Sequence, residues 1–141
     1  MPTRTSKARW QGSVTDGEGT VALGSGAYEG PYSFRSRFED GKGTNPEELV
    51  AAAHAGCFSM AFTHVLGEAG YAANSVETSA GVTLSTVDDG FTITRIHLAT
   101  RADVPGIDAA EFTRLADSAK SGCVVSRALA AVEITLDAAL V

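Results

Sequence analysis

Residues 43–66, GTNPEELVAAAHAGCFSMAFTHVL, decide the fold. Asn45 can cap a helix, Pro46 suits the first helical position because its missing N–H costs nothing there, and Glu48 completes a capping box. Of the 18 residues that follow Glu48, 13 are apolar and none is Asp, Glu, Lys or Arg. A helix with one solvated face would carry charges every third or fourth residue. We therefore predict a long central helix, ending near Gly67, that is buried on every side.

Length and composition indicate one globular domain. The chain has 141 residues, enough for one hydrophobic core, and its 44% hydrophobic and 20% charged residues are typical of folded proteins. A net charge of -6 with scattered basic residues argues against a nucleic-acid partner. The N-terminus lacks the apolar core of a signal peptide, and the Gly, Ser, Thr and His residues of the central run favour protein burial over a membrane span. We expect a cytoplasmic protein that does not bind a membrane.

The segment before the central helix is predicted to form an antiparallel sheet. Its three short strands are expected at residues 8–14, 20–23 and 32–38, with glycine-rich turns between them. In the third strand, alternation would place Phe34 and Phe38 on one face and Arg37 on the other.

The segment after the central helix is predicted to alternate strands and helices. A strand at residues 75–87, a hairpin turn at residues 88–90 and a strand at residues 91–100 come first, and the apolar side of the last strand changes near Arg95, which indicates a bulge. A second helix starts at Asp108 and stops before Cys123, which precedes a helical turn. The final strand is expected at residues 133–137.

This order of elements predicts an α+β fold in which antiparallel sheets pack on two main helices. We expect a single domain over residues 1–141, made of an N-terminal β segment at residues 1–40 and a core at residues 44–141. One small sheet cannot cover a helix on every side. A homodimer that sandwiches the central helix would supply the missing cover.

The two cysteines, Cys57 and Cys123, are the candidates for chemistry. In a reducing compartment such a pair is more often catalytic, or simply buried, than a structural disulfide. Cys123 lies near a helix start, where a thiolate is favoured. Gly56 leaves room for a small substrate beside Cys57. Neighbouring apolar side chains could line a pocket there: Phe58, Met60 and Phe62. No close group of metal ligands is apparent, and neither a metal nor a cofactor is expected.

Two blocks around these cysteines, GTNPEELVAAAHAGCFSMA and SGCVVSRAL, resemble the signature blocks of the OsmC/Ohr family of organic hydroperoxide peroxidases. The runs RFEDGKGTNPEEL, LGEAGY, VPGID and EITLD also match, so the resemblance covers nearly the whole chain and is closest to the OsmC branch. It implies an intertwined homodimer with sites at the interface. It also implies an organic hydroperoxide as substrate and a dithiol, such as a dihydrolipoyl protein, as reductant.

The resemblance also implies roles for individual residues. Cys57 matches the peroxidatic cysteine, and Cys123 matches the resolving cysteine that condenses with it to a disulfide. Arg37 matches the arginine that holds the thiolate, and Glu47 matches the carboxylate that positions this arginine. The family commonly has proline after the second cysteine, where this chain has Val124. This departure is expected to loosen the turn that carries Cys123 and to slow resolution.

The spacing of Glu47 and Cys57 leaves the geometry of the site open. Ten residues span roughly 15 Å along a straight helix, so the two side chains cannot touch on one continuous helix. Either Arg37 bridges them, or the helix is broken between them, or the partner subunit supplies one group.

Two other functions compete with a peroxidase. His54, one turn before Cys57, could activate it as in Cys–His hydrolases, although the sequence favours a hydrogen-bonded core histidine at this position. A dimeric module that binds a small apolar ligand without catalysis would leave both cysteines inert. Replacing Cys123 should spare a hydrolase and should leave a peroxidase prone to over-oxidation.

Overall fold

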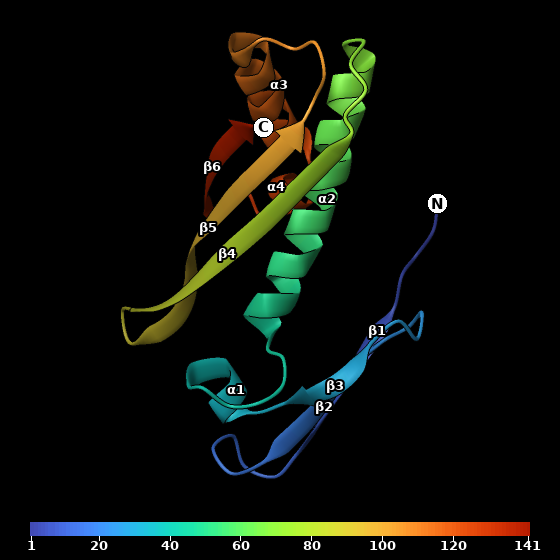
Figure 1. The fold of residues 1–141 in the computed structure, drawn as a ribbon. Coiled ribbons are helices and arrows are strands. Elements are labelled where there is room, and N and C mark those ends of the chain that lie inside the picture. The colour runs from blue at the N-terminus through green and yellow to red at the C-terminus, as the bar shows by residue number, and fades with distance from the viewer. The chain divides into compact units, whose positions relative to one another are not determined.

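A computed structural model describes residues 1–141, which form two compact units, Met1–Leu49 and Val50–Val141. The first unit holds a three-stranded sheet and a short helix, and the second holds a three-stranded sheet and two helices (Figure 1). The boundary between the units falls inside the long helix α2 (Pro46–Glu68). The architecture is the α+β arrangement that the sequence predicts.

The first unit is an antiparallel sheet in the order β1-β2-β3, coloured blue in Figure 1. Its strands are β1 (Ser6–Gln11), β2 (Glu18–Leu23) and β3 (Glu29–Tyr32). Gly19 pairs with Trp10 on one side and Tyr32 on the other, and the two rings meet across it with centroids 5.3 Å apart. A Cβ at Gly19 would lie 2.5 Å from the Tyr32 ring and 2.7 Å from the Trp10 ring, so the contact requires glycine.

The third predicted strand is wrong beyond Tyr32, because the chain turns there into helix α1 (Phe34–Phe38). A reciprocal capping box starts this helix. The Ser36 N–H donates to the Ser33 hydroxyl at 3.1 Å, and the Ser33 N–H donates to the Ser36 hydroxyl at 2.8 Å. Phe34 and Phe38 still share a face, with ring centroids 4.7 Å apart, because residues four apart meet on a helix. Arg37 therefore lies in the last turn of a helix and not on a strand.

Helix α2 begins as the sequence predicts. The Glu48 N–H donates to the Asn45 side chain at 2.8 Å, which confirms the cap. The return bond of the capping box is absent, because the Glu48 carboxylate accepts from the Thr44 hydroxyl at 2.6 Å. By length and composition alone α2 could cross a membrane, which many core helices of globular proteins could also do.

The prediction that α2 is buried on every side is wrong for the single chain. Its inner face is fully buried through His54, Phe58, Phe62 and Leu66. The opposite face is exposed and consists of small and mixed side chains: Ala52, Ala53, Gly56, Met60, Thr63, His64 and Gly67.

The second unit contains the mixed sheet β4-β5-β6. Strands β4 (Ser75–Val87) and β5 (Gly90–Asp103) form the predicted hairpin, and the turn residues Asp88 and Asp89 have φ of 49° and 65°. The predicted bulge is confirmed, because Thr83 pairs with Arg95 while Leu84 pairs with Ile93, which leaves one residue of β5 unopposed.

The last strand, β6 (Glu133–Leu140), runs parallel to β5, so this sheet is not wholly antiparallel as predicted. Parallel neighbours need a long crossover connection. Helices α3 (Ala109–Gly122) and α4 (Val124–Ala128) provide it, and Asp108 caps α3 by accepting from the Glu111 N–H at 2.8 Å. The crossover brings the junction of α3 and α4, and Cys123 with it, back toward the core.

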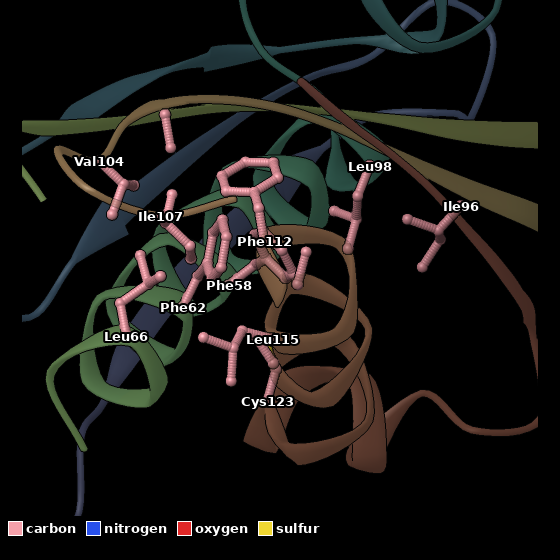
Figure 2. Packing of buried hydrophobic residues seen from close by; sticks show 13 residues of the cluster. Phe58, Phe62, Leu66, Ile96, Leu98, Val104, Ile107, Phe112, Leu115 and Cys123 are labelled. Carbon is pink, nitrogen blue, oxygen red and sulfur yellow. The ribbon is translucent and has the colours of Figure 1, made fainter. Parts of the chain in front are cut away.

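The hydrophobic core lies where α2, α3 and β5 meet (Figure 2). Phe62 packs against Phe58 with ring centroids 5.8 Å apart and edge-on against Phe112 at 5.3 Å. Cys123, 1% exposed, belongs to the same cluster. Because Phe58 and Phe62 are core residues and Met60 is 77% exposed, these three do not line the predicted pocket beside Cys57.

Candidate active site

Two free thiols lie side by side in the second unit. Cys57 comes from the middle of α2 and Cys123 from the junction of α3 and α4, and their sulfur atoms are 3.0 Å apart. This distance is that of a hydrogen bond between sulfurs and is longer than the roughly 2.05 Å of a disulfide. Cys57 is half-buried and Cys123 is buried. The structure therefore brings the two predicted cysteines together in reduced form.

Backbone hydrogen bonds hold Cys123 in place on both sides. Its N–H donates to the Ala119 carbonyl at 2.9 Å and so ends α3. Its carbonyl accepts from the Arg127 N–H at 3.0 Å and so starts α4. The predicted position of Cys123 beside a helix start is confirmed, and the sulfur is anchored by two helices.

The pKa values of the two thiols are shifted in opposite directions. Burial raises the pKa of Cys57, and the neighbouring Cys123 raises it further, against smaller opposing effects of the Val125 and Val124 N–H groups. Burial also disfavours the Cys123 thiolate, but the pKa of Cys123 is lowered overall by the neighbouring Cys57 thiol, the Ser126 and Val125 N–H groups and the Ser126 hydroxyl. A cation near Cys57 would lower its pKa and favour its thiolate.

Arg37 and Glu47 form a forked ion pair in the first unit. Arg37 Nη2 donates to Glu47 Oε1 at 2.7 Å, and Arg37 Nε lies 3.2 Å from both carboxylate oxygens. Glu47 is 8% exposed, whereas the Arg37 side chain is 38% exposed. The guanidinium also lies over the Phe38 ring, 5.4 Å from its centroid. Glu47 thus fixes the direction of a guanidinium that remains accessible.

A second arginine of α1, Arg35, has a different environment. It pairs with Glu39 at 3.4 Å, and both side chains are more than half exposed. An exposed pair of this kind orients its arginine weakly. Of the two arginines, only Arg37 has a buried carboxylate as its anchor.

An apolar hollow of about 200 Å³ adjoins Arg37 within the first unit. Its walls are mostly aromatic: Trp10, Val14, Tyr32, Ser33, Phe34, Arg37 and Phe38. Sequence reasoning missed this hollow and placed the apolar pocket on α2 instead. The available signal was the density of aromatic residues on both sides of Arg37.

Helix α2 is uninterrupted from Pro46 to Glu68. One of the three explanations for the spacing of Glu47 and Cys57, a break in the helix between them, is therefore excluded.

His54 forms a hydrogen bond with a partner that the sequence did not indicate. Its Nε2 lies 2.7 Å from the Ser126 hydroxyl, and both residues are buried. Burial lowers the pKa of His54, which is therefore neutral. Because Nε2 is engaged by Ser126, the hydrolase interpretation, in which His54 activates Cys57, loses support. Ser126 itself was missed, and its only signal was its place three residues after Cys123.

Comparison with known proteins agrees with these arrangements. A family model described as OsmC-like protein matches residues 39–137. The chain is 53% identical over 132 residues to peroxiredoxin OsmC of Escherichia coli (strain K12), covering 93% of this chain and 92% of that protein. It is 36% identical over 98 residues to the organic hydroperoxide resistance protein of Xanthomonas axonopodis pv. citri (strain 306), covering 68% and 67%. The crystal structure of organic hydroperoxide resistance protein OhrB of Bacillus subtilis matches with a TM-score of 0.75 at 26% identity, covering 95% of this chain and 97% of that one. The chain belongs to the OsmC-like protein family.

Proposed function

We propose that this protein is a thiol-dependent peroxidase that reduces organic hydroperoxides to alcohols. The observation that carries the proposal is the contact of two free thiols, 3.0 Å apart, on separate helices. Two thiols at this distance can form a disulfide with a movement of about 1 Å. The names of the relatives, peroxiredoxin and organic hydroperoxide resistance protein, support the same chemistry.

In the first step the Cys57 thiolate attacks the peroxide. An S–O bond forms, the O–O bond breaks, and the departing alkoxide takes up a proton to become the alcohol. Cys57 is thereby oxidised to a sulfenic acid. Only the thiolate reacts at a useful rate, so the raised pKa of Cys57 must be overcome.

Arg37 supplies the charge that this step needs. Its guanidinium keeps its proton at any physiological pH, and it can stabilise both the thiolate and the alkoxide that leaves. Glu47 holds the guanidinium in a fixed direction through the forked ion pair. The Cys57 on which Arg37 acts belongs either to the same subunit or to the partner subunit.

In the second step Cys123 attacks the sulfenic acid of Cys57. The S–S bond forms, the S–O bond breaks, and the hydroxide leaves as water with the proton that Cys123 gives up. A dithiol, such as a dihydrolipoyl group on a protein, then reduces the disulfide and is itself oxidised. Val124 in place of proline is expected to slow the approach of Cys123.

The substrate class follows from the hollow beside Arg37. Its aromatic walls favour peroxides with an apolar body, such as aryl or fatty-acyl hydroperoxides, over hydrogen peroxide. A dimeric protein that only binds such apolar molecules remains the competing function.

We further propose that residues 1–141 act as one domain within a cytoplasmic homodimer. The open face of α2 supports this assembly, because Met60 is exposed there and Gly56 has open space around it. In the variant Met60→Glu, the buried charge should shift the protein from dimer to monomer in analytical ultracentrifugation. A monomeric wild-type protein at micromolar concentration would contradict the assembly.

The test of the proposed function is consumption of cumene hydroperoxide with a dithiol reductant, for the wild type, Cys57→Ser and Cys123→Ser. Intact mass after peroxide alone is measured in parallel. Loss of turnover in Cys57→Ser, with loss of two hydrogens in the wild type, supports the cycle. Cys123→Ser should instead accumulate two or three added oxygens. No consumption and no mass change would refute the peroxidase and favour the binding module.

A further inference from the structure

A buried polar pair, His54 and Ser126, lies beside Cys123. His54 Nε2 lies 2.7 Å from the Ser126 hydroxyl, and Ser126 follows Cys123 by three residues within α4. The Ser126 hydroxyl contributes to the lowered pKa of Cys123. His54 is 0% exposed and Ser126 is 6% exposed. The two residues come from α2 and α4, so their hydrogen bond joins the helix that carries Cys57 to the helix that follows Cys123. The cycle described above uses neither His54 nor Ser126.

A hydrogen-bond chain from His54 through Ser126 to Cys123 would have one consistent direction. The Ser126 hydroxyl has a single proton, and if it donates to the Cys123 thiolate, its oxygen must accept from a proton on His54 Nε2. Nδ1 of His54 then carries a bare lone pair. It is buried without a hydrogen-bond partner, which is an unfavourable arrangement for a residue that serves packing alone. Because burial keeps the ring neutral, His54 donates a hydrogen bond and does not act as a base.

We propose that His54 is a positioning residue for the second step of the reaction. Its Nε2–H holds the Ser126 hydroxyl in the orientation that donates to Cys123 while this sulfur becomes a thiolate and attacks the sulfenic acid of Cys57. The proposal rests on the proposed peroxidase function for its role, but its hydrogen-bond chain can be tested without peroxide.

The step needs no additional reagent. Cys123 loses its proton, its sulfur bonds to Cys57, and the hydroxide that leaves Cys57 takes up a proton to form water. The protons of His54 and Ser126 remain in place throughout. The chain changes only the fraction of Cys123 that is thiolate. It thus sets how often resolution precedes attack by a second peroxide, which would over-oxidise Cys57.

The first experiment titrates Cys123 alone. In a Cys57→Ser background, the thiolate absorbance at 240 nm is followed against pH for four proteins that carry His54, His54→Leu, His54→Gln or Ser126→Ala. The leucine and alanine variants should raise the pKa of Cys123 by about one unit, a tenfold smaller thiolate fraction below that pKa. Glutamine can place an N–H near the position of Nε2 and should restore most of the wild-type value. Equal pKa values in all four proteins would overturn the proposal.

The second experiment measures the outcome in the enzyme with both cysteines. Each variant receives graded equivalents of cumene hydroperoxide, and intact mass gives the ratio of disulfide to sulfinic acid. The ratio should fall about tenfold in His54→Leu and Ser126→Ala and recover in His54→Gln.

The two experiments separate the possible failures. A purely structural His54 would leave both the ratio and the Cys123 titration unchanged, whatever happened to the melting temperature. If the wild type does not react with peroxide, the peroxidase function fails, while the titration still decides whether the hydrogen-bond chain exists. If His54→Leu does not fold, Ser126→Ala and His54→Gln carry the same comparison.

Discussion

The ion pair of Arg37 and Glu47 should be worth more than an ion pair of the same length at the surface. The variant Glu47→Gln keeps the shape of the side chain and removes its charge, so it leaves a partly buried guanidinium without a counter-ion. Breaking a fully buried pair costs about 3–5 kcal/mol and breaking an exposed pair about 0–1 kcal/mol. With Glu47 8% exposed and Arg37 38% exposed, we expect a loss of about 2 kcal/mol in the free energy of unfolding. This corresponds to roughly 6–10 °C in melting temperature.

The chain supplies a matched control for this variant. Glu111 pairs with Arg114 with the same Nη2–Oε1 distance of 2.7 Å, but the two side chains are 28% and 65% exposed. Glu111→Gln should leave the melting temperature close to that of the wild type, because solvent screens the pair. Under the proposed function, Glu47→Gln should also lower kcat/KM for cumene hydroperoxide by about tenfold to a hundredfold, because the arginine loses its fixed direction. Equal melting temperatures for the two variants, or full activity in Glu47→Gln, would refute the reasoning.

Three further outcomes are expected. In Arg37→Met the raised pKa of Cys57 is uncompensated, so the remaining peroxidase activity should increase as pH rises from 7 to 9; a flat profile would exclude the arginine as the source of charge. Val124→Pro removes an N–H that favours the Cys57 thiolate, so the pKa of Cys57 should rise by less than about one unit in a thiol titration. Because proline restricts the unfolded chain, the free energy of unfolding measured by urea denaturation should increase by about 0.4–1 kcal/mol. Phe62→Ala empties the centre of the core against Phe112 and should cost about 3–5 kcal/mol by urea denaturation, and a loss below about 1 kcal/mol would contradict the packing described.

The elements that could be predicted from the sequence are those with local signals. Asn45 and Asp108 cap their helices through contacts with residues three positions away, and the paired aspartates at residues 88–89 mark the hairpin. The error at residues 32–38 has an equally local cause. Phe34 and Phe38 are four residues apart, a spacing that fits one face of a strand and one face of a helix alike. The serines at positions 33 and 36 decide for the helix, because their side chains satisfy the first free N–H groups.

Features that depend on distant parts of the chain could not be predicted in the same way. Alternation along residues 133–137 indicates a strand but not its direction, and the parallel pairing of β6 follows from the path of α3 and α4. Arg37 and Glu47 were assigned through family resemblance, and their contact depends on the turn that α1 makes before α2. Ser126 has no meaning in the sequence alone, because its role depends on His54, which lies 72 residues earlier.

The unequal burial of Cys57 and Cys123 determines which sulfur of the disulfide a reductant attacks. Cys57 is half-buried while Cys123 is 1% exposed, so an incoming reductant reaches the disulfide of the proposed cycle at the Cys57 sulfur. The mixed disulfide then forms on Cys57, and Cys123 is the leaving group. A thiol with a lower pKa departs faster, and the donors around Cys123 lower its pKa. The hydrogen bonds that prepare Cys123 to attack would therefore also prepare it to depart, and one set of donors would serve both the closing and the opening of the same bond.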